Sequence, residues 1–240
     1  MEQAVLNDLG FAHFLSHTDG VGKLVLTALL LLSVASWYLI FTRAIANTLA
    51  QKRAAAFLAG FWDAPSLQDV SHALAAQPID NAFAELAQQA LQAASDSEAH
   101  NPHKLAAAGG LGEFLTRVLR NGIDQEAARV EHGLTVLASA GSAAPYVGLF
   151  GTVWGIYHAL VQIGLSGQGT LDKVAGPVGE ALIMTALGLA VAIPAVLAYN
   201  AFNRRNRMWL ARLDAFAHDL YVLTTVGSVK SGNLRQGEPP

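Results

Sequence analysis

The stretch GLFGTVWGI, residues 148–156, holds three glycines, two aromatic side chains and no charge. Gly148, Gly151 and Gly155 recur at i, i+3 and i+7, which places them on one face of a helix. A soluble helix rarely tolerates so much glycine, because each glycine costs about 1 kcal/mol relative to alanine. A half-buried strand would alternate polar and apolar residues, and this stretch does not. It therefore predicts a helix with close neighbours in apolar surroundings.

The charges of the chain are few and unevenly distributed, which predicts a membrane protein. Only 14% of the 240 residues are charged and the mean hydropathy is positive, whereas soluble proteins carry about 25% charged residues. Glu180 is the only charged residue in the runs 24–42, 132–171 and 174–203. Each run can cross the hydrocarbon core, which needs about 20 apolar residues. We therefore predict an all-α integral membrane protein with three transmembrane helices, at residues 22–42, 134–163 and 175–203.

The basic residues predict how these helices are oriented. Lys23 and Lys173 would lie on one side of the membrane, and every other lysine and arginine on the opposite side. Because the basic side faces the cytoplasm, the N-terminus is predicted outside and the C-terminus inside. On the outer side this division gives a segment at residues 1–21, with a short amphipathic helix or a frayed end, and a short loop at 164–174. On the cytoplasmic side it gives a large region at 43–133 and a tail at 204–240.

The cytoplasmic region 43–133 is rich in alanine, with polar residues at helical spacing, as in NAFAELAQQALQAA at 81–94. This periodicity predicts two to four helices, some of which extend the transmembrane helices into the cytoplasm. The region offers little apolar surface, so we do not expect a separate domain with a core of its own.

Small residues give two of the predicted helices smooth faces. Lipid tails provide no hydrophobic drive between helices, so membrane helices associate where small residues let their backbones approach. Gly148, Gly151 and Gly155 form such a face on the second helix, and Gly188 contributes to one on the third. These faces pack either within one chain or between copies of it. Three thin helices offer few internal surfaces, so we favour a homo-oligomeric helical bundle.

Glu180 and two threonines are the candidate functional residues. A carboxylate within the bilayer costs about 3 kcal/mol and usually faces a protein interior or a water-filled path. Counting helix rise from each end of the outer loop places Glu180 and Thr152 at a similar depth, with Thr185 about 7 Å deeper. We predict that these three residues form a polar pathway. The alternative is that Glu180 extends to the outer interface and the hydroxyl groups bond carbonyl groups of their own helix.

Two prolines, Pro145 and Pro194, lie inside predicted transmembrane helices. Proline lacks the backbone N–H and removes one helical hydrogen bond, so each is a candidate kink. Hinge roles for these kinks are open at this stage, although tolerated kinks are commoner.

Other function classes find no support in the sequence. There is no cysteine, no His-Glu-x-x-His pair and no Gly-x-Ser-x-Gly elbow, so we predict no metal, no cofactor and no enzyme chemistry. GVGK at 20–23 lacks the first glycine of a phosphate loop. A net charge of −3 gives no reason to expect a nucleic acid as partner.

Two long motifs resemble a known family. APYVGLFGTVWGI at 144–156 and GPVGEALIMTALGLAVAIPAVLAYN at 176–200 are similar to the ExbB/TolQ/MotA proton-channel family. Within it, GQGTLDKVAGPVGEAL at 167–182 and the chain length resemble ExbB most, while TolQ shares GLFGTVWGI and AIPAV. MotA-type proteins usually have four spans, and this chain has three predicted spans.

The resemblance implies a location and a set of partners. It implies a homopentamer in the bacterial inner membrane, around two copies of the single-span partner ExbD. Such a complex uses proton flow to drive TonB, which energises uptake of siderophores and vitamin B12 through the outer membrane. The resemblance also implies that Glu180, Thr152 and Thr185 line the pore, and that the principal proton-binding aspartate belongs to ExbD. The alternatives are a TolQ-like subunit for envelope maintenance, with TolR and TolA as partners, or a scaffold that conducts nothing.

Overall fold

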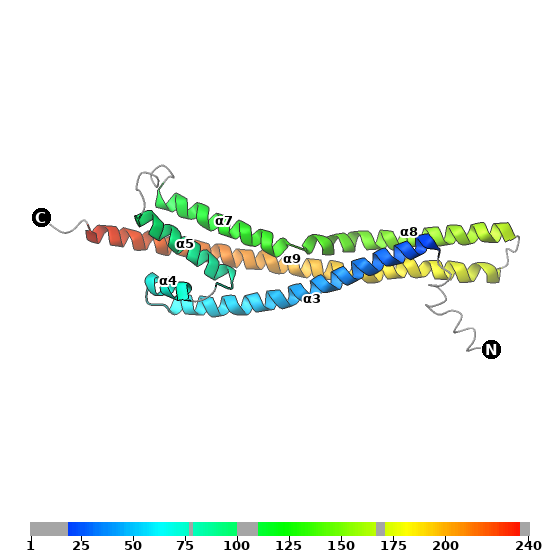
Figure 1. Cartoon of the computed structure of the whole chain (residues 1–240), viewed down its shortest axis with the longest axis horizontal. Coiled ribbons are helices and arrows are strands. Elements are labelled where there is room, and N and C mark those ends of the chain that lie inside the picture. Colours follow the sequence, from blue (N-terminus) through cyan, green and yellow to red (C-terminus); the bar gives the residue numbers. More distant parts are fainter. Residues whose placement is uncertain (1–18, 77–78, 100–109, 167–170, 236–240) are drawn as a thin grey trace. The chain divides into compact units, whose positions relative to one another are not determined.

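The computed structural model describes residues 19–76, 79–99, 110–166 and 171–235. In these residues the chain is helical and contains no strand, which confirms the all-α prediction for them. The amphipathic helix considered for residues 1–21 lies almost entirely outside them. Figure 1 shows the helices α3 (Gly20–Asp63), α4 (Leu67–Ala76), α5 (Ala82–Ala99), α7 (Leu111–Glu131), α8 (Leu134–Ser166) and α9 (Leu171–Arg235).

Three helical stretches of the described chain are long and apolar enough to cross a membrane: Gly20–Asp63, Leu111–Leu165 and Ala175–Thr225. The second of them joins α7 to α8 across a short break at Gly133, where φ is +81°. Positive φ is a conformation that glycine adopts at little cost. The number of candidate spans therefore agrees with the number of apolar runs in the sequence.

The helices are longer than the runs that lack charge. α3 and α9 continue beyond the spans predicted at 22–42 and 175–203, and helix covers both ends of the loop predicted at 164–174. The helices exceed the predicted spans because a fall in hydropathy along the sequence marks only where the apolar surface ends. It does not end the helix itself, because alanine, glutamine, lysine and arginine are good helix formers. The limits of the membrane-embedded part stay predictions.

The described chain forms two compact units. The first contains the described residues of the ranges 19–43 and 133–202. The second contains the described residues of the ranges 44–132 and 203–235. In the first unit α8 and α9 lie side by side (Figure 1). Its buried core takes residues from all three helices, namely Val25, Leu29, Ala144, Met184, Val191 and Ala192.

The second unit has a hydrophobic core of its own, so our expectation of too little apolar surface was wrong. Phe61 and Phe216 stack edge to face with ring centroids 5.0 Å apart, and Phe83 meets Trp209 at 5.1 Å. Such aromatic pairs contribute about 0.5–1.5 kcal/mol beyond their buried area. Trp209 and Phe216 belong to the part of α9 beyond residue 203, which the sequence analysis assigned to a cytoplasmic tail apart from the 43–133 region. The core closes because α9 joins the helices of the 43–133 region.

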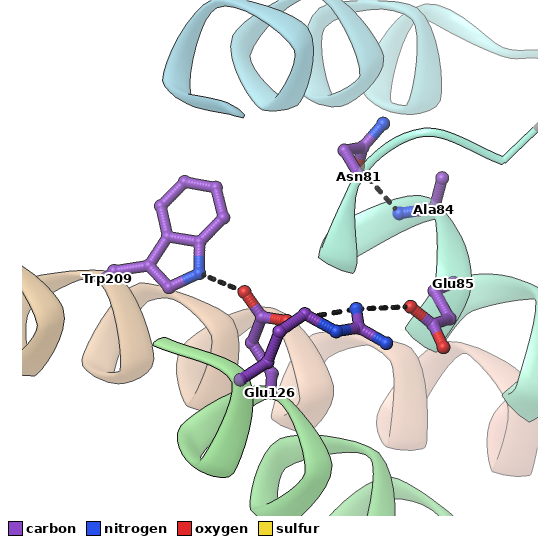
Figure 2. A network of polar contacts seen from close by, with 6 residues as sticks. Asn81, Ala84, Glu85, Glu126 and Trp209 are labelled. Atoms are coloured by element: carbon purple, nitrogen blue, oxygen red, sulfur yellow. Dashed lines mark hydrogen bonds and ion pairs between the residues drawn. The ribbon is translucent and has the colours of Figure 1, made fainter. Parts of the chain in front are cut away.

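A buried carboxylate ties α7 to α9 in the second unit (Figure 2). Glu126 is 8% exposed, and its Oε1 accepts a hydrogen bond from Trp209 Nε1 at 2.9 Å. Its Oε2 lies 3.2 Å from Arg129 Nη1, which also pairs with Glu85 of α5 at 3.0 Å. Both carboxylate oxygens therefore have partners, as a buried charge requires. The network fixes the side of α7 that faces α9.

Candidate functional site

The closest approach of α8 and α9 occurs at two glycines. A Cβ atom built on Gly148 would lie 2.6 Å from the carbonyl oxygen of Met184 and 3.0 Å from the Cα of Gly188. A Cβ on Gly188 would lie 2.6 Å from the carbonyl oxygen of Ala144. Real Cβ atoms do not come this close to backbone atoms, so only glycine fits at either position. The two backbones touch here.

The other two glycines of the stretch continue the same contact surface. A Cβ on Gly151 would lie 2.9 Å from Val25 Cγ1 of α3 and 3.2 Å from Met184 Cγ, and one on Gly155 would lie 3.0 Å from Ala181 Cβ. These contacts support packing within one chain, whereas we had favoured contact between copies for this face. The connection between α8 and α9 is so short that it brings two small-residue faces together in the same chain.

Thr152 and Thr185, two of the three predicted pathway residues, are in direct contact. Their Oγ1 atoms lie 2.6 Å apart, and Thr152 Oγ1 also lies 2.9 Å from the carbonyl oxygen of Ala181. The carbonyl of Gly148, on the same helix, is 3.2 Å away, so the bond to its own helix that we had considered is present too. Thr152 is only 5% exposed. The hydroxyl groups therefore form a chain from α8 to α9, with Thr152 on the inside and Thr185 half-buried.

Glu180 precedes Ala181 on α9 and is half-buried. Because the carbonyl of Ala181 accepts the bond from Thr152, the backbone beside Glu180 lies at the level of the threonine pair. The depth of these residues within the membrane stays a prediction. Glu180 and Thr185 are five positions apart, about 140° around an ideal helix. Both side chains can line one path only if that path is wide.

The two prolines lie inside continuous helices. Pro145 belongs to α8 and Pro194 to α9, as the sequence indicated, and α9 also contains Pro177 close to its start. Kinks at Pro145 and Pro194 stay predictions. Pro145 directly follows Ala144, whose carbonyl oxygen faces Gly188. A change of bend at Pro145 would therefore act on the glycine contact.

Asp19 is a residue that the sequence analysis did not single out. Its Oδ2 accepts a hydrogen bond of 2.6 Å from Trp154 Nε1, and its Oδ1 accepts one of 2.8 Å from the backbone N–H of Gly22. Burial raises the pKa of Asp19, but these hydrogen bonds and the nearby His158 outweigh it, so the pKa is lowered from its ordinary value of 3.8. The carboxylate is thus charged at neutral pH. A residue 135 positions from its partner gives no periodic signal in the sequence.

A family model matches residues 76–215 of the chain, and its description is the MotA/TolQ/ExbB proton channel family. The chain belongs to this family. The matched region contains Glu180, both threonines, the four glycines of the helix contact and the two predicted kinks. Asp19 lies outside it.

The relatives of this chain in the MotA/TolQ/ExbB proton channel family include some named ExbB and others named TolQ. A biopolymer transport protein ExbB from Xanthomonas campestris is 42% identical over 94% of this chain and 92% of the relative. An ExbB from Neisseria meningitidis is 46% identical over 82% of this chain and 89% of the relative. A Tol-Pal system protein TolQ from Pseudomonas aeruginosa is 34% identical over 93% and 96%. The family is therefore shown over nearly the whole chain.

Proposed function

We propose that this chain is the ExbB-type subunit of a proton-driven complex in the bacterial inner membrane. In this proposal five copies surround two single-span ExbD-like partners, and proton flow through the complex drives a TonB-like protein. The N-terminus lies in the periplasm, the C-terminus lies in the cytoplasm, and α3 and α9 extend into the cytoplasm. The transported cargo would be siderophores and vitamin B12, taken up through the outer membrane.

The hydrogen bond between Thr152 and Thr185, beside Glu180, is the observation that carries the proposal. Glu180 is the only carboxylate in the apolar run 174–203. A pair of hydroxyl groups near it can orient water molecules or form part of a hydrogen-bonded chain. The identity of 42–46% to relatives named ExbB supports this branch of the family. Since Thr152 is buried against α9, we assign it the task of holding Thr185. Glu180 and Thr185 would then face the pore.

In this proposal the membrane potential provides the energy that the complex transfers to the TonB-like protein. One elementary charge that crosses the membrane releases about 2.3 kcal/mol per 100 mV. The principal proton carrier would be an aspartate of the partner, and Glu180 would provide a polar wall for it. Repeated proton transfers would shift the partner helices against the surrounding ring.

Growth on a ferric siderophore tests the proposal. A strain without this gene would be complemented with the wild type, with Glu180→Ala and with the control Glu113→Ala, at equal expression. Glu113 is an exposed residue whose i,i+4 pair with Arg117 contributes little. We expect growth with the wild type and the control, and none with Glu180→Ala. Growth with Glu180→Ala at the wild-type rate would overturn the role of Glu180.

A TolQ-like function is the second candidate, because the Pseudomonas aeruginosa TolQ matches 93% of the chain. In that case deletion of the gene would leave iron uptake intact and make the cells sensitive to detergent. Proton flux into liposomes that contain the purified complex separates both candidates from a scaffold, which would give no flux.

A further inference from the structure

One side of α8 makes a short hydrogen bond to Asp19, the residue just before α3. Trp154 Nε1 donates to Asp19 Oδ2 at 2.6 Å, which is shorter than most N–H···O hydrogen bonds, in the direction expected for a charged acceptor. The same carboxylate accepts from the N–H of Gly22, and the carbonyl oxygen of Asp19 accepts from the N–H of Lys23 at 3.0 Å. Asp19 is thus the N-cap of α3, and the indole of Trp154 is fixed to that cap.

The opposite side of α8 carries the threonine contact. Thr152 and Trp154 are two positions apart, and two positions turn a helix by about 200°. Their side chains therefore leave α8 in nearly opposite directions, Thr152 toward Ala181 of α9 and Trp154 toward Asp19. The two residues differ in height by only about 3 Å. Two contacts at one level on opposite sides of a helix fix its rotation about its own axis.

Between these two contacts the packing surface of α8 contains three glycines, Gly148, Gly151 and Gly155. At the level of the threonine pair, α8 faces α9 with Gly148 and Gly155, which present no side chains of their own to Met184 and Ala181 of α9. Gly151 lies between Val25 of α3 and Met184 of α9, and again adds no side chain of its own. Smooth surfaces of this kind let helices approach, but they do not define one rotation as large interdigitating side chains would. The polar contacts are the directional ones.

We propose that Asp19 is a positioning residue, which holds Trp154 and so keeps the hydroxyl of Thr152 on Ala181 and Thr185. This rests on the proposed function, in which the threonine pair presents Thr185 to the pore. Loss of the indole hydrogen bond frees α8 to rotate and removes Thr152 from its partners. The defect appears in transport even when the complex assembles in full.

Trp154→Phe is the decisive variant, because it keeps a ring and removes only the N–H donor. Trp37→Phe is its matched control, since Trp37 of α3 is 46% exposed and none of the described hydrogen bonds involves its indole. We expect siderophore-dependent uptake to fall about three- to twentyfold in Trp154→Phe, the range that one interhelical hydrogen bond in a membrane provides. Trp37→Phe should retain wild-type uptake. Uptake is scored per assembled complex.

Two further comparisons separate positioning from general stability. In a Thr152→Val background Trp154→Phe should cause no further loss, because the two changes act on the same hydroxyl. Asp19→Asn keeps a carbonyl oxygen as acceptor and should retain more uptake than Asp19→Ala. Additive losses in the double variant, or loss of the assembled complex in Trp154→Phe, would overturn the positioning role, as would wild-type uptake in Trp154→Phe.

Failure of the proposed function gives a different result. If the wild-type gene restores detergent resistance and not iron uptake, the ExbB assignment fails. The same variants are then compared by detergent resistance in place of iron uptake. The double variant Thr152→Val with Trp154→Phe then still tests the positioning role of Asp19.

Discussion

At the scale of single residues, Thr152 has one hydroxyl hydrogen and three oxygen neighbours. The hydroxyl can donate to one carbonyl and accept from Thr185, and both roles are used when the donor bond goes to Ala181. In an apolar setting each such bond between helices contributes about 0.6 kcal/mol on average and up to about 1.7 kcal/mol. The pair is therefore a substantial part of the specific contact between α8 and α9.

Thr152→Val should destabilise the protein by about 1–2 kcal/mol, because valine keeps the shape and leaves the Ala181 carbonyl and the Thr185 hydroxyl without this partner. The measurement is the unfolding midpoint of the purified protein. Thr27→Val is the control, since the exposed Thr27 hydroxyl bonds only the Lys23 carbonyl of its own helix. An equal change in both variants would contradict the interhelical role.

The Asp19 carboxylate makes a prediction about pH. Its pKa is lowered in the folded protein, so its contribution to stability is fully present above the ordinary value of 3.8 and is lost as the pH falls through the lower folded value. The difference in unfolding midpoint between the wild type and Asp19→Asn should not shrink from pH 7 to pH 5. It should shrink only below about pH 4. A difference that shrinks already between pH 7 and pH 5 would contradict this linkage.

At the scale of helices, the contact between α8 and α9 depends on the absence of side chains. An alanine at Gly188 would place its Cβ 2.6 Å from the Ala144 carbonyl oxygen, and a rigid backbone atom cannot rotate away. The helices would have to separate along the whole contact. Since Thr152 lies one helical turn from Gly148, the threonine pair would separate as well.

We expect Gly188→Ala to lower the unfolding midpoint and to abolish proton flux, because overpacking of a tight contact costs about 1–3 kcal/mol. Gly179→Ala on the same helix is the control, as a Cβ there meets no atom within 4 Å. The measurements are thermal unfolding and flux in liposomes. If Gly179→Ala were as harmful as Gly188→Ala, general loss of glycine would explain the result and not the close approach.

The helices show what the sequence could predict. Runs without charge identified three apolar helices, because lipid exposure leaves a one-dimensional signal. The sequence placed Thr152 and Thr185 in one polar pathway, but it did not predict the direct hydrogen bond between them. That bond depends on the close approach of the helices at Gly148 and Gly188. The core of the second unit was missed because Trp209 and Phe216 lie beyond the apolar runs. The bond of Asp19 to Trp154 leaves no local pattern at all.

At the scale of the whole molecule, two units of different character share one chain. In the first unit large apolar side chains point outward, among them Leu31 and Tyr146, which are 65% and 73% exposed. In the second unit the largest buried side chains are aromatic and the outward positions are mostly polar. This contrast is expected when lipid surrounds the first unit and water surrounds the second.

The proposed orientation of the chain rests on its basic residues and can be tested with introduced cysteines. The sequence contains no cysteine, so an introduced cysteine is the only reactive thiol. Gly164→Cys lies near the end of α8 in open space, and Arg212→Cys lies on an exposed position of α9. A maleimide that cannot cross membranes should label Gly164→Cys in spheroplasts and label Arg212→Cys only after the membrane is opened. The reverse pattern would place the basic ends of α3 and α9 outside. It would contradict the proposed orientation, in which the N-terminus lies in the periplasm and the C-terminus lies in the cytoplasm.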